Sequence, residues 1–332
     1  MDMATKEKLL ALLEQHTDEY VSGQEIAEQL GISRAAVWKA IRALERDGCR
    51  IHGVTGLGYR LESAGNRIHA AGIHRFLSDK CDFCDLRVYP VLPSTNDTAK
   101  ALAAEGAPEG TVVIAESQTA GKGRMRRQFF SPGGTGIYMS ILLRPQISAE
   151  DALDITTAAA AAVADAIDAE TGKKSAIKWV NDVFLDGKKV CGILTEGAMG
   201  MEDGSLEYAI LGIGINAVEP EGGFPEELRE IAGAVWPADS KINDCRNRLI
   251  AAVLTRFFAY YRELDAKTFL RSYQSRSLLR GKSVDVIRGN TVRPAIAGEI
   301  DDACRLQVTY EDGSEEWISS GEVSVRSTEG YR

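Results

Sequence analysis

The segment GKGRMRRQFFSPGGTG, residues 121–136, gathers positive charge on a glycine-rich stretch of an acidic chain. The chain has 332 residues and a formal net charge of -9, whereas this segment carries four cations: Lys122, Arg124, Arg126 and Arg127. Guanidinium forks match phosphate oxygens, and glycines let backbone N–H groups approach an anion closely. The segment therefore indicates a loop that orders over a nucleotide or an acyl-phosphate, although a solvated surface loop has the same composition.

The sequence lacks the motifs of several common active sites. The phosphate-binding pattern GxxxxGK[ST] is absent, and the GKGR segment precedes a strand pattern rather than a helix, unlike a Rossmann GxGxxG. GxSxG is absent too, and the four histidines lie outside the polar segments: His16, His52, His69 and His74. These absences favour catalysis by positioning and electrostatics, as in nucleotidyl and phosphoryl transfer.

A second polar group lies in KWVNDVFLDGKKVCGILTEG, residues 178–197. Lys178, Asn181 and Asp182 follow one strand pattern, and Lys189 begins the next after an Asp-Gly turn. A hairpin of this shape brings Lys189 beside the other three. Asn and Asp together suit a metal ion or a phosphate, although a plain hairpin with a solvated lysine has the same pattern.

Two shorter stretches offer further contacts. Gly212 and Gly214 interrupt the strand pattern LGIGINA, which indicates close approach of another group to the backbone, whether a ligand or a packed neighbour. The stretch PSTNDTAK offers small hydrogen-bonding side chains at a helix start: Ser94, Thr95 and Asn96. A plain helix N-cap also explains this second pattern.

Three segments of the chain are expected to position these groups. Residues 66–275 alternate strand and helix patterns, which predicts a mixed α/β domain of enzyme size. Residues 276–332 show short strand patterns with Gly-containing turns and predict a small SH3-like β-barrel. Residues 1–65 form the remaining domain. The predicted fold is thus a multidomain α/β (α+β) protein.

The first segment predicts a winged helix-turn-helix. Ser22 and Ser33 can each cap a helix, and Gly31 ends the first of the two. The pieces CRIHGV and GYRLES then predict a hairpin, or wing. The second helix carries a local excess of cations, which favours DNA binding over a small protein-binding module.

The predicted DNA contacts lie on and around this second helix. Within a helix-turn-helix spanning about Gly23 to Arg42, the N-terminal part of the second helix faces the base edges. The contacts expected are Ser33, Arg34, Lys39 and Arg42. Arg60 on the wing is expected to reach phosphate or the minor groove, and Trp38 to pack in the core or against a helix rather than contact bases.

Cysteine usage and hydropathy indicate a cytoplasmic protein. Of the six cysteines only Cys81 and Cys84 form a CxxC, and no second CxxC or histidine pair completes a zinc site. The N-terminus lacks the features of a signal peptide, and the longest run of small apolar residues is too short to span a bilayer. We therefore expect free thiols and no membrane partner.

Taken together and in order, the motifs resemble those of the biotin protein ligases. The set comprises STN, ESQTAGKGRxxR, SPxGxxxYxS, KWxND, a lysine before a GILTE-like strand, and GIGIN. With the helix-turn-helix, the chain resembles the bifunctional biotin ligase and biotin-operon repressors over nearly its whole length. The resemblance implies that biotin and Mg-ATP give biotinyl-5′-adenylate, whose biotinyl group passes to a lysine of the biotin carboxyl carrier protein of acetyl-CoA carboxylase.

The resemblance also implies roles for individual residues. Biotin would contact Ser94, Thr95, Asn96, Gln118, Lys122, Gly123, Arg124 and Lys189. The nucleotide would contact Lys178, Asn181, Asp182, Asn216 and Arg326, with Asp182 also holding Mg²⁺. The catalytic residues would be Lys189, Arg124 and Lys122, which stabilise negative charge while the loop closes over the adenylate. The adenylate would act as corepressor by inducing a homodimer that binds operator DNA.

Two departures from the family pattern concern the loop and the hairpin. The family loop GRGRxGR reads GKGRMRR here, so Lys122 keeps a charge without the bidentate fork, and Arg126 replaces a glycine. Val180 stands where the family has proline in KWPND. Three alternatives remain open: a lipoate-type ligase, a biotin-sensing repressor without catalysis, and a ligase with a vestigial N-terminal domain.

Overall fold

The structure is a computed structural model that describes residues 3–16, 19–46, 49–63, 66–145, 147, 152–199, 206–240, 242–289, 291–319 and 322–325. The chain divides into two compact units. One comprises residues 1–79 with 241–251, and the other residues 80–240 with 252–332. The predicted domain boundaries after residues 65 and 275 stay predictions.

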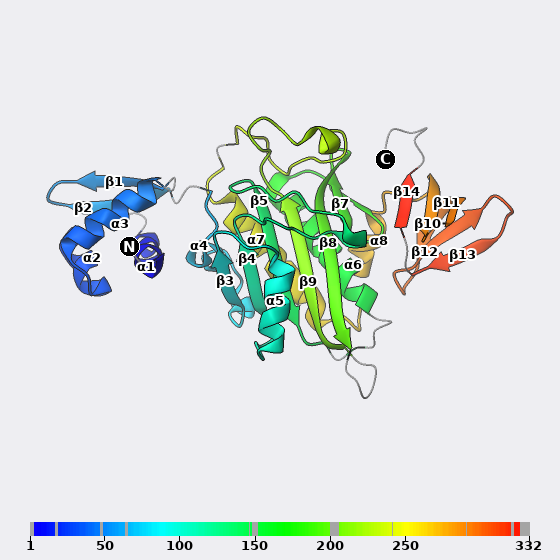
Figure 1. Ribbon diagram of the computed structural model, residues 1–332, viewed down its shortest axis with the longest axis horizontal. Helices are drawn as coiled ribbons and strands as arrows, with labels where there is room; N and C mark the ends of the chain where they lie inside the picture. Colours follow the sequence, from blue (N-terminus) through cyan, green and yellow to red (C-terminus); the bar gives the residue numbers. More distant parts are fainter. Residues whose placement is uncertain are drawn as a thin grey trace. The chain divides into compact units, whose positions relative to one another are not determined.

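The N-terminal unit begins with the predicted winged helix-turn-helix (Figure 1). Its elements are α1 Met3–Gln15, α2 Gly23–Leu30, α3 Arg34–Arg46, the antiparallel strands β1 Arg50–Val54 and β2 Gly58–Ser63, and α4 Ala70–His74. Ser22 caps α2 by accepting from the Glu25 N–H at 3.1 Å, and Ser33 caps α3 from the Ala36 N–H at 3.2 Å. Gly31 ends α2 with φ +63°, so both predicted caps and the glycine stop are confirmed.

Apolar residues of the three helices form the core of this part. It includes Leu9, Leu13, Ile26, Val37 and Leu44. The expectation that Trp38 joins this core is wrong, because 53% of its surface is exposed. Helical spacing explains the difference, since Val37, Ile41 and Leu44 occupy the inward face and Trp38 falls on the outward one.

A seven-stranded mixed sheet forms the centre of the second unit. Its order is β3 Asp85–Tyr89, β4 Thr111–Ala115, β5 Gly136–Leu143, β9 Leu206–Asn216, β8 Lys188–Met199, β7 Asp182–Leu185 and β6 Ala176–Lys178. Among the strand pairs of this sheet in the described residues, only β3–β4 is parallel. The strands β4 and β5 are buried throughout and accordingly are mostly apolar, since both of their faces are covered.

Helices cover both faces of the sheet (Figure 1). They are α5 Thr95–Ala104 on one face and α6 Ala152–Thr171 on the other, followed by α7 Cys245–Arg262 and α8 Leu270–Ser275. Short 3-10 turns occur at Asp79–Cys81, Arg124–Arg126 and Glu226–Leu228. The predicted mixed α/β domain is confirmed, and α8 is a helix that the hydrophobic pattern did not indicate.

The C-terminal part is a five-stranded antiparallel sheet. Its order is β13 Glu315–Ile318, β12 Leu306–Tyr310, β11 Thr291–Ile300, β10 Ser283–Arg288 and β14 Glu322–Val325. The Trp179 indole N–H, next to the KWVND polar group, donates to the Cys304 carbonyl at 2.9 Å and so ties this sheet to the site. Within the described ranges β13 and β14 do not pair, so closure into a barrel stays a prediction.

Candidate functional site

The motif residues converge on one pocket of about 540 Å³ in the second unit. The STN helix start, the cationic loop, the KWVND hairpin and the glycine-containing strand β9 all line it. Polar side chains gather in two groups at different places in the pocket. One lies around the N-terminus of α5, and the other between the loop and strands β7 and β8.

A hydrogen-bond network holds the first group in place. Gln118 Oε1 accepts from the Thr95 N–H at 2.8 Å, and the Gln118 amide donates to Ser131 Oγ at 3.0 Å. Ser140 Oγ lies 2.8 Å from Thr95 Oγ1 and 2.6 Å from Asn96 Oδ1. Because these polar groups are largely buried and mutually bonded, they present a fixed set of donors and acceptors.

Ser94 plays the structural part that its position indicates. Its hydroxyl oxygen accepts from the Asp97 N–H at 3.5 Å, and its side chain is 1% exposed. The N-cap interpretation therefore accounts for Ser94. Thr95 and Asn96, both buried, do not cap the helix and face the network instead.

The two glycines of β9 make room for side chains of the pocket. A Cβ at Gly212 would lie 2.2 Å from Asn96 Oδ1, and one at Gly214 would lie 2.7 Å from the Phe129 ring. The close approach indicated by the sequence is thus made by packed neighbours. Those neighbours themselves line the pocket, so the glycines set its depth.

An ionic cluster flanks the first group. Glu196 accepts from Asn96 Nδ2 at 2.7 Å and from Lys100 Nζ at 2.5 Å. Burial acts to raise the pKa of Glu196, but the hydrogen bonds from Lys100 and Asn96 outweigh burial and hold that pKa below its usual range. The carboxylate stays ionised and fixes the orientation of the Asn96 amide.

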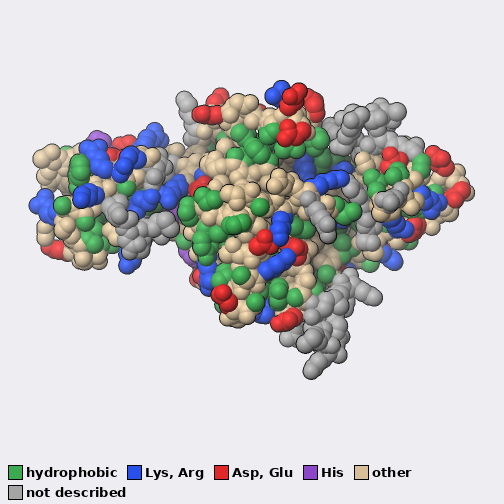
Figure 2. All heavy atoms as spheres, viewed as in Figure 1, with side chains coloured by type: hydrophobic (Ala, Val, Ile, Leu, Met, Phe, Trp, Pro, Cys, Tyr) green, Lys and Arg blue, Asp and Glu red, His purple; other side chains and the backbone are tan. Residues whose placement is uncertain are grey.

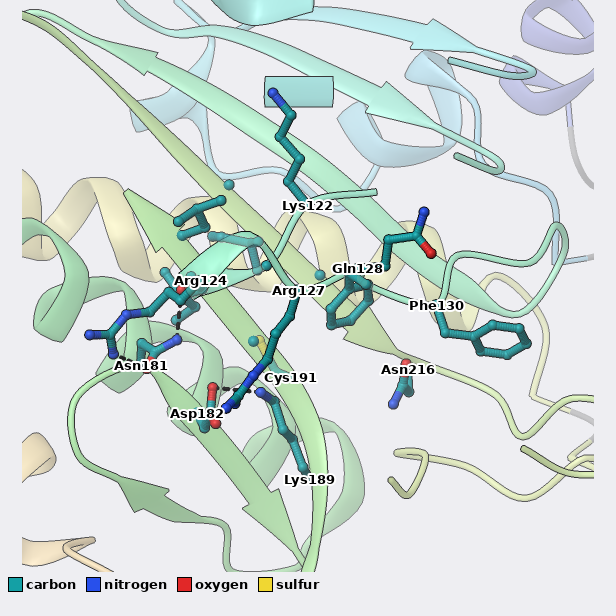
Figure 3. A pocket seen from close by; sticks show the side chains of 18 of the residues that line it. Lys122, Arg124, Arg127, Gln128, Phe130, Asn181, Asp182, Lys189, Cys191 and Asn216 are labelled. Carbon is teal, nitrogen blue, oxygen red and sulfur yellow. Dashed lines mark hydrogen bonds and ion pairs between the residues drawn. The ribbon is translucent and has the colours of Figure 1, made fainter. Parts of the chain in front are cut away.

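The second group centres on Asn181, which is 8% exposed. Its Oδ1 accepts from the Arg124 guanidinium at 2.8 Å, and its Nδ2 donates to the Ile193 carbonyl at 2.8 Å (Figure 3). Both ends of the amide are bonded, so its orientation is determined. Arg124, a loop residue, is thereby held against the hairpin that carries Asn181.

Lys189 and Asp182 form an ion pair beside Asn181. Lys189 Nζ lies 2.7 Å from Asp182 Oδ1, across the β7–β8 pairing. The predicted hairpin contact is therefore present. Arg127 extends from the loop toward the same pair (Figure 3). This end of the pocket combines positive charge with one carboxylate, an arrangement suited to a phosphate and a divalent cation.

The cationic loop closes on itself like a short hairpin. The Gly123 N–H donates to the Arg127 carbonyl at 2.7 Å, and the Phe129 N–H donates to the Gly121 carbonyl at 2.9 Å. Met125 takes the positive φ of the turn, +55°. The left-handed residue of the turn is therefore Met125. It immediately precedes Arg126, the position at which the family pattern has glycine.

Lys122 lies at the pocket rim with its ammonium turned away from Arg124 and Lys189 (Figure 3). Its Nζ lies 2.5 Å from Asp97 Oδ1 of α5. The hydrogen bond to Asp97 raises the pKa of Lys122 despite slight desolvation. The expected contacts of Lys122 with biotin and the adenylate stay predictions, and in the structure its ammonium pairs with Asp97 of α5.

The similarity to known proteins follows the whole chain. Family models match in order: an HTH domain over residues 5–60, the biotin/lipoate A/B protein ligase family over 88–216, and the biotin protein ligase C-terminal domain over 281–326. The bifunctional ligase/repressor BirA of Bacillus subtilis is 39% identical over 263 residues, 79% of this chain and 80% of the relative. This chain belongs to the biotin protein ligase family.

Other relatives agree with this assignment. The bifunctional ligase/repressor BirA of Escherichia coli is 31% identical over 97% of both chains. Among solved structures, the biotin protein ligase from Aquifex aeolicus in complex with biotin and ATP aligns with a TM-score of 0.60 and 26% identity. That alignment covers 73% of this chain and 98% of the other.

Of the remaining residues expected of a biotin protein ligase, some line the pocket and others lie outside the described residues. Lys178 ends β6 and lines the pocket, and Asn216 ends β9 and donates to the Gly233 carbonyl at 3.0 Å. Gly123 lines the rim. Arg326 and the side chain of Arg126 lie outside the described residues.

Sequence reasoning missed one wall of the ligase pocket. It is formed by apolar residues between β9 and α7: Phe224, Leu228, Ile231 and Ala232. The Phe224 ring packs edge-on against Phe130 of the loop, with centroids 6.4 Å apart. Apolar residues in the polar, Gly- and Pro-containing stretch EGGFPEELREIAG were the available signal for a ligand wall.

No described helix is long and apolar enough to cross a membrane. Nor do the described ranges contain a cluster of three His, Cys, Asp or Glu side chains placed to hold a metal ion. The six cysteines are free thiols, as expected.

Proposed function

We propose that this chain is an ATP-dependent biotin protein ligase that also binds operator DNA and represses transcription. In the first step a biotin carboxylate oxygen attacks the α-phosphorus of ATP, and the bond to pyrophosphate breaks. In the second a carrier-protein lysine amine attacks the acyl carbon, and AMP leaves. The observation that supports this most directly is the convergence of all six motifs on one pocket with an amide-rich end and a cationic end.

The first polar group is the proposed biotin end. Thr95, Asn96 and Gln118 offer fixed donors and acceptors for the ureido ring, with the Asn96 amide oriented by Glu196. The rings of Phe129 and Tyr138, 6.2 Å apart, give apolar surface beside it. A pre-oriented, largely buried polar set binds a neutral cyclic urea with little reorganisation.

The second polar group is the proposed reaction centre. Lys189 and Arg124 stabilise charge as it moves from the α-phosphate to the departing pyrophosphate. Asn181 orients Arg124, and Lys178 and Asn216 lie on the nucleotide side. Asp182 is the proposed carboxylate that would hold Mg²⁺, and a bound Mg²⁺ would neutralise phosphate charge there.

The proposed repressor activity rests on the N-terminal unit. Lys and Arg side chains gather on its surface (Figure 2). Arg34, Lys39 and Arg42 are exposed on α3, while Arg60 of the wing stacks over Tyr20 at 4.9 Å. We propose that biotinyl-adenylate promotes a homodimer whose paired α3 helices bind a two-fold operator.

Biotin-dependent ATP–pyrophosphate exchange tests the ligase. Wild-type protein is expected to exchange, and Lys189→Ala to lose roughly a hundredfold or more of the rate, as removal of one charge stabiliser does elsewhere. Lys173→Ala is the matched control, since Lys173 pairs with Asp186 at the exposed end of the same hairpin. Absence of exchange in folded wild-type protein that binds biotin would leave a sensing repressor instead.

The same assay distinguishes a biotin ligase from a lipoate-type ligase. Lipoate in place of biotin is expected to support no exchange, because its dithiolane ring has no groups to pair with the Thr95, Asn96 and Gln118 set. Exchange with lipoate alone would reverse the assignment. Gel shifts on the biotin-gene promoters of the source organism test whether the helix-turn-helix is functional.

A further inference from the structure

Helix α3 presents two contrasting faces. Val37, Ile41 and Leu44 are buried in the core of the N-terminal unit. On the outward side a row with a spacing of four residues comprises Arg34, Trp38 and Arg42. Residues four apart are neighbours on a helix surface, so Arg34, Trp38 and Arg42 lie in line along one face.

Trp38 is unusual for a surface residue, because 53% of its side chain is exposed on a helix with a complete apolar face elsewhere. The Arg42 guanidinium carbon lies 5.6 Å from the centroid of the ring. Arg42 also donates to Glu45 at 2.9 Å. The indole and Arg42 therefore hold each other in a defined arrangement on the face that points outward.

The charges near Trp38 indicate which kind of partner binds this face of α3. Arg34, Lys39 and Arg42 are exposed around the ring, and Arg46 extends the same face by one turn. This density of positive charge favours a polyanion over a protein surface. Ala35, also exposed, adds no bulk beside Trp38, so the helix can approach a groove closely.

We propose that Trp38 is a specificity-determining residue that contacts the 5-methyl group of a thymine in the major groove. The thymine methyl is the one apolar group that bases present in that groove, and it is read by apolar contact. An indole has a large apolar surface for that contact, while the flanking cations bind phosphate. This inference rests on the proposed DNA binding and extends it to a particular base.

The experiment separates the methyl contact from DNA binding as a whole. Full-length protein with biotin and ATP selects its site from a random duplex pool. Each thymine of the selected site is then replaced in turn by uracil, which lacks only the methyl group. We expect one thymine in each half-site whose replacement weakens wild-type binding about three- to tenfold.

Trp38→Ala should bind the thymine and uracil duplexes equally at that position. Lys39→Ala should bind both more weakly and keep the thymine preference, because a lysine ammonium attracts the anionic DNA without contacting the methyl group. The side chain of Trp38 lies outside the core, and circular dichroism of each variant checks that the fold is retained.

Three results would overturn the inference. If Trp38→Ala still discriminated between the thymine and uracil duplexes, or if no thymine methyl affected wild-type binding, the proposed base contact would be wrong while the proposed DNA binding would stand. Loss of dimerisation in Trp38→Ala, measured by sedimentation, without any methyl effect would assign the ring to a protein interface. Failure to select any duplex by a protein that still performs exchange would overturn the proposed repressor activity and this contact together.

Discussion

Lys122 Nζ lies 2.5 Å from Asp97 Oδ1, so the first cation of the loop is bound to the first turn of α5. Asp97 follows directly on Asn96, the residue that Glu196 orients at the proposed biotin end. The cationic loop that lines the pocket and the helix at the proposed biotin end are therefore joined by one ion pair.

Breaking this ion pair should let the adenylate escape sooner. We expect Asp97→Asn to raise the rate at which biotinyl-adenylate leaves the enzyme several-fold, because the loop loses its tie to α5. Release is measured by stopped-flow after a single turnover without carrier protein. The charge-swapped pair Asp97→Lys with Lys122→Asp should restore slow release, whereas Asp186→Asn, at the exposed Lys173 pair, should change nothing. Equal release in wild type and Asp97→Asn would refute the tie.

Gly212→Ala should weaken biotin binding specifically. Its Cβ would lie 2.2 Å from Asn96 Oδ1, so the amide must move away from Ser140 and Glu196. We expect the KM for biotin to rise at least tenfold, with a much smaller change in the KM for ATP. Gly133→Ala is the matched control, since its Cβ meets nothing closer than 3.8 Å. An equal rise in both KM values would point to general unfolding of the pocket.

Asn181→Ala should impair adenylation while leaving biotin binding unchanged. The substitution removes the acceptor that holds Arg124 and leaves the buried Ile193 carbonyl without its donor. We expect a loss of ~1–3 kcal/mol in folding stability from that unpaired carbonyl. The exchange rate should fall by more than the stability loss explains, whereas the biotin Kd from calorimetry stays constant. If Asn181→Ala exchanged at the wild-type rate, the position of Arg124 would not matter for the reaction.

Glu14 makes the N-terminal unit sensitive to pH. Burial, then the charge of Asp244, raises the pKa of Glu14 to about 7 against the opposing charge of Arg75. The folded state therefore holds a proton that the unfolded state has lost above about pH 4.5, and stability falls as pH rises from there to about 7. His69 Nε2, 3.2 Å from Glu14 Oε1, is the adjacent titratable partner.

Glu14→Gln should remove this sensitivity. The variant is expected to match wild type at about pH 4, where Glu14 is protonated in the folded and the unfolded state, and to be more stable by about 3 kcal/mol at pH 8, where the buried carboxylate has ionised in wild type. Native-state hydrogen exchange of α1 amides, corrected for intrinsic rates, measures the difference. A wild-type protein more stable at pH 8 than at pH 5.5 would have the opposite sign and exclude this account.

Local signals predicted much of this molecule. Ser22, Gly31 and Ser33 mark the ends of the DNA-binding helices because caps act within three residues of their own position. The polar residues of the STN, KWVND and GKGR motifs were predicted as site candidates because their side-chain chemistry can be recognised without knowing the fold. The pairing of Lys189 with Asp182 followed from the short hairpin turn alone.

The features that were missed depend on contacts between distant segments. The Asp97 partner of Lys122 lies 25 residues away, and Phe224 reaches the pocket from a stretch with no periodicity. Gly212 was recognised as a place of close approach, but the identity of the approaching group, Asn96, required the fold. Trp38 was misplaced because its large apolar side chain outweighed its position on the helical face.

The glycines of β9 have a consequence for the size of the acid that the pocket accepts. Asn96 sits over Gly212, and Asn216 ends the same strand four residues later, a rise of ~13 Å along an extended chain. A hydrogen-bonded strand has a nearly fixed rise per residue, so β9 sets the separation of the proposed ring-binding end from the proposed nucleotide side. A homologue of biotin with fewer methylenes would bind its ring and leave its carboxylate short of Lys189.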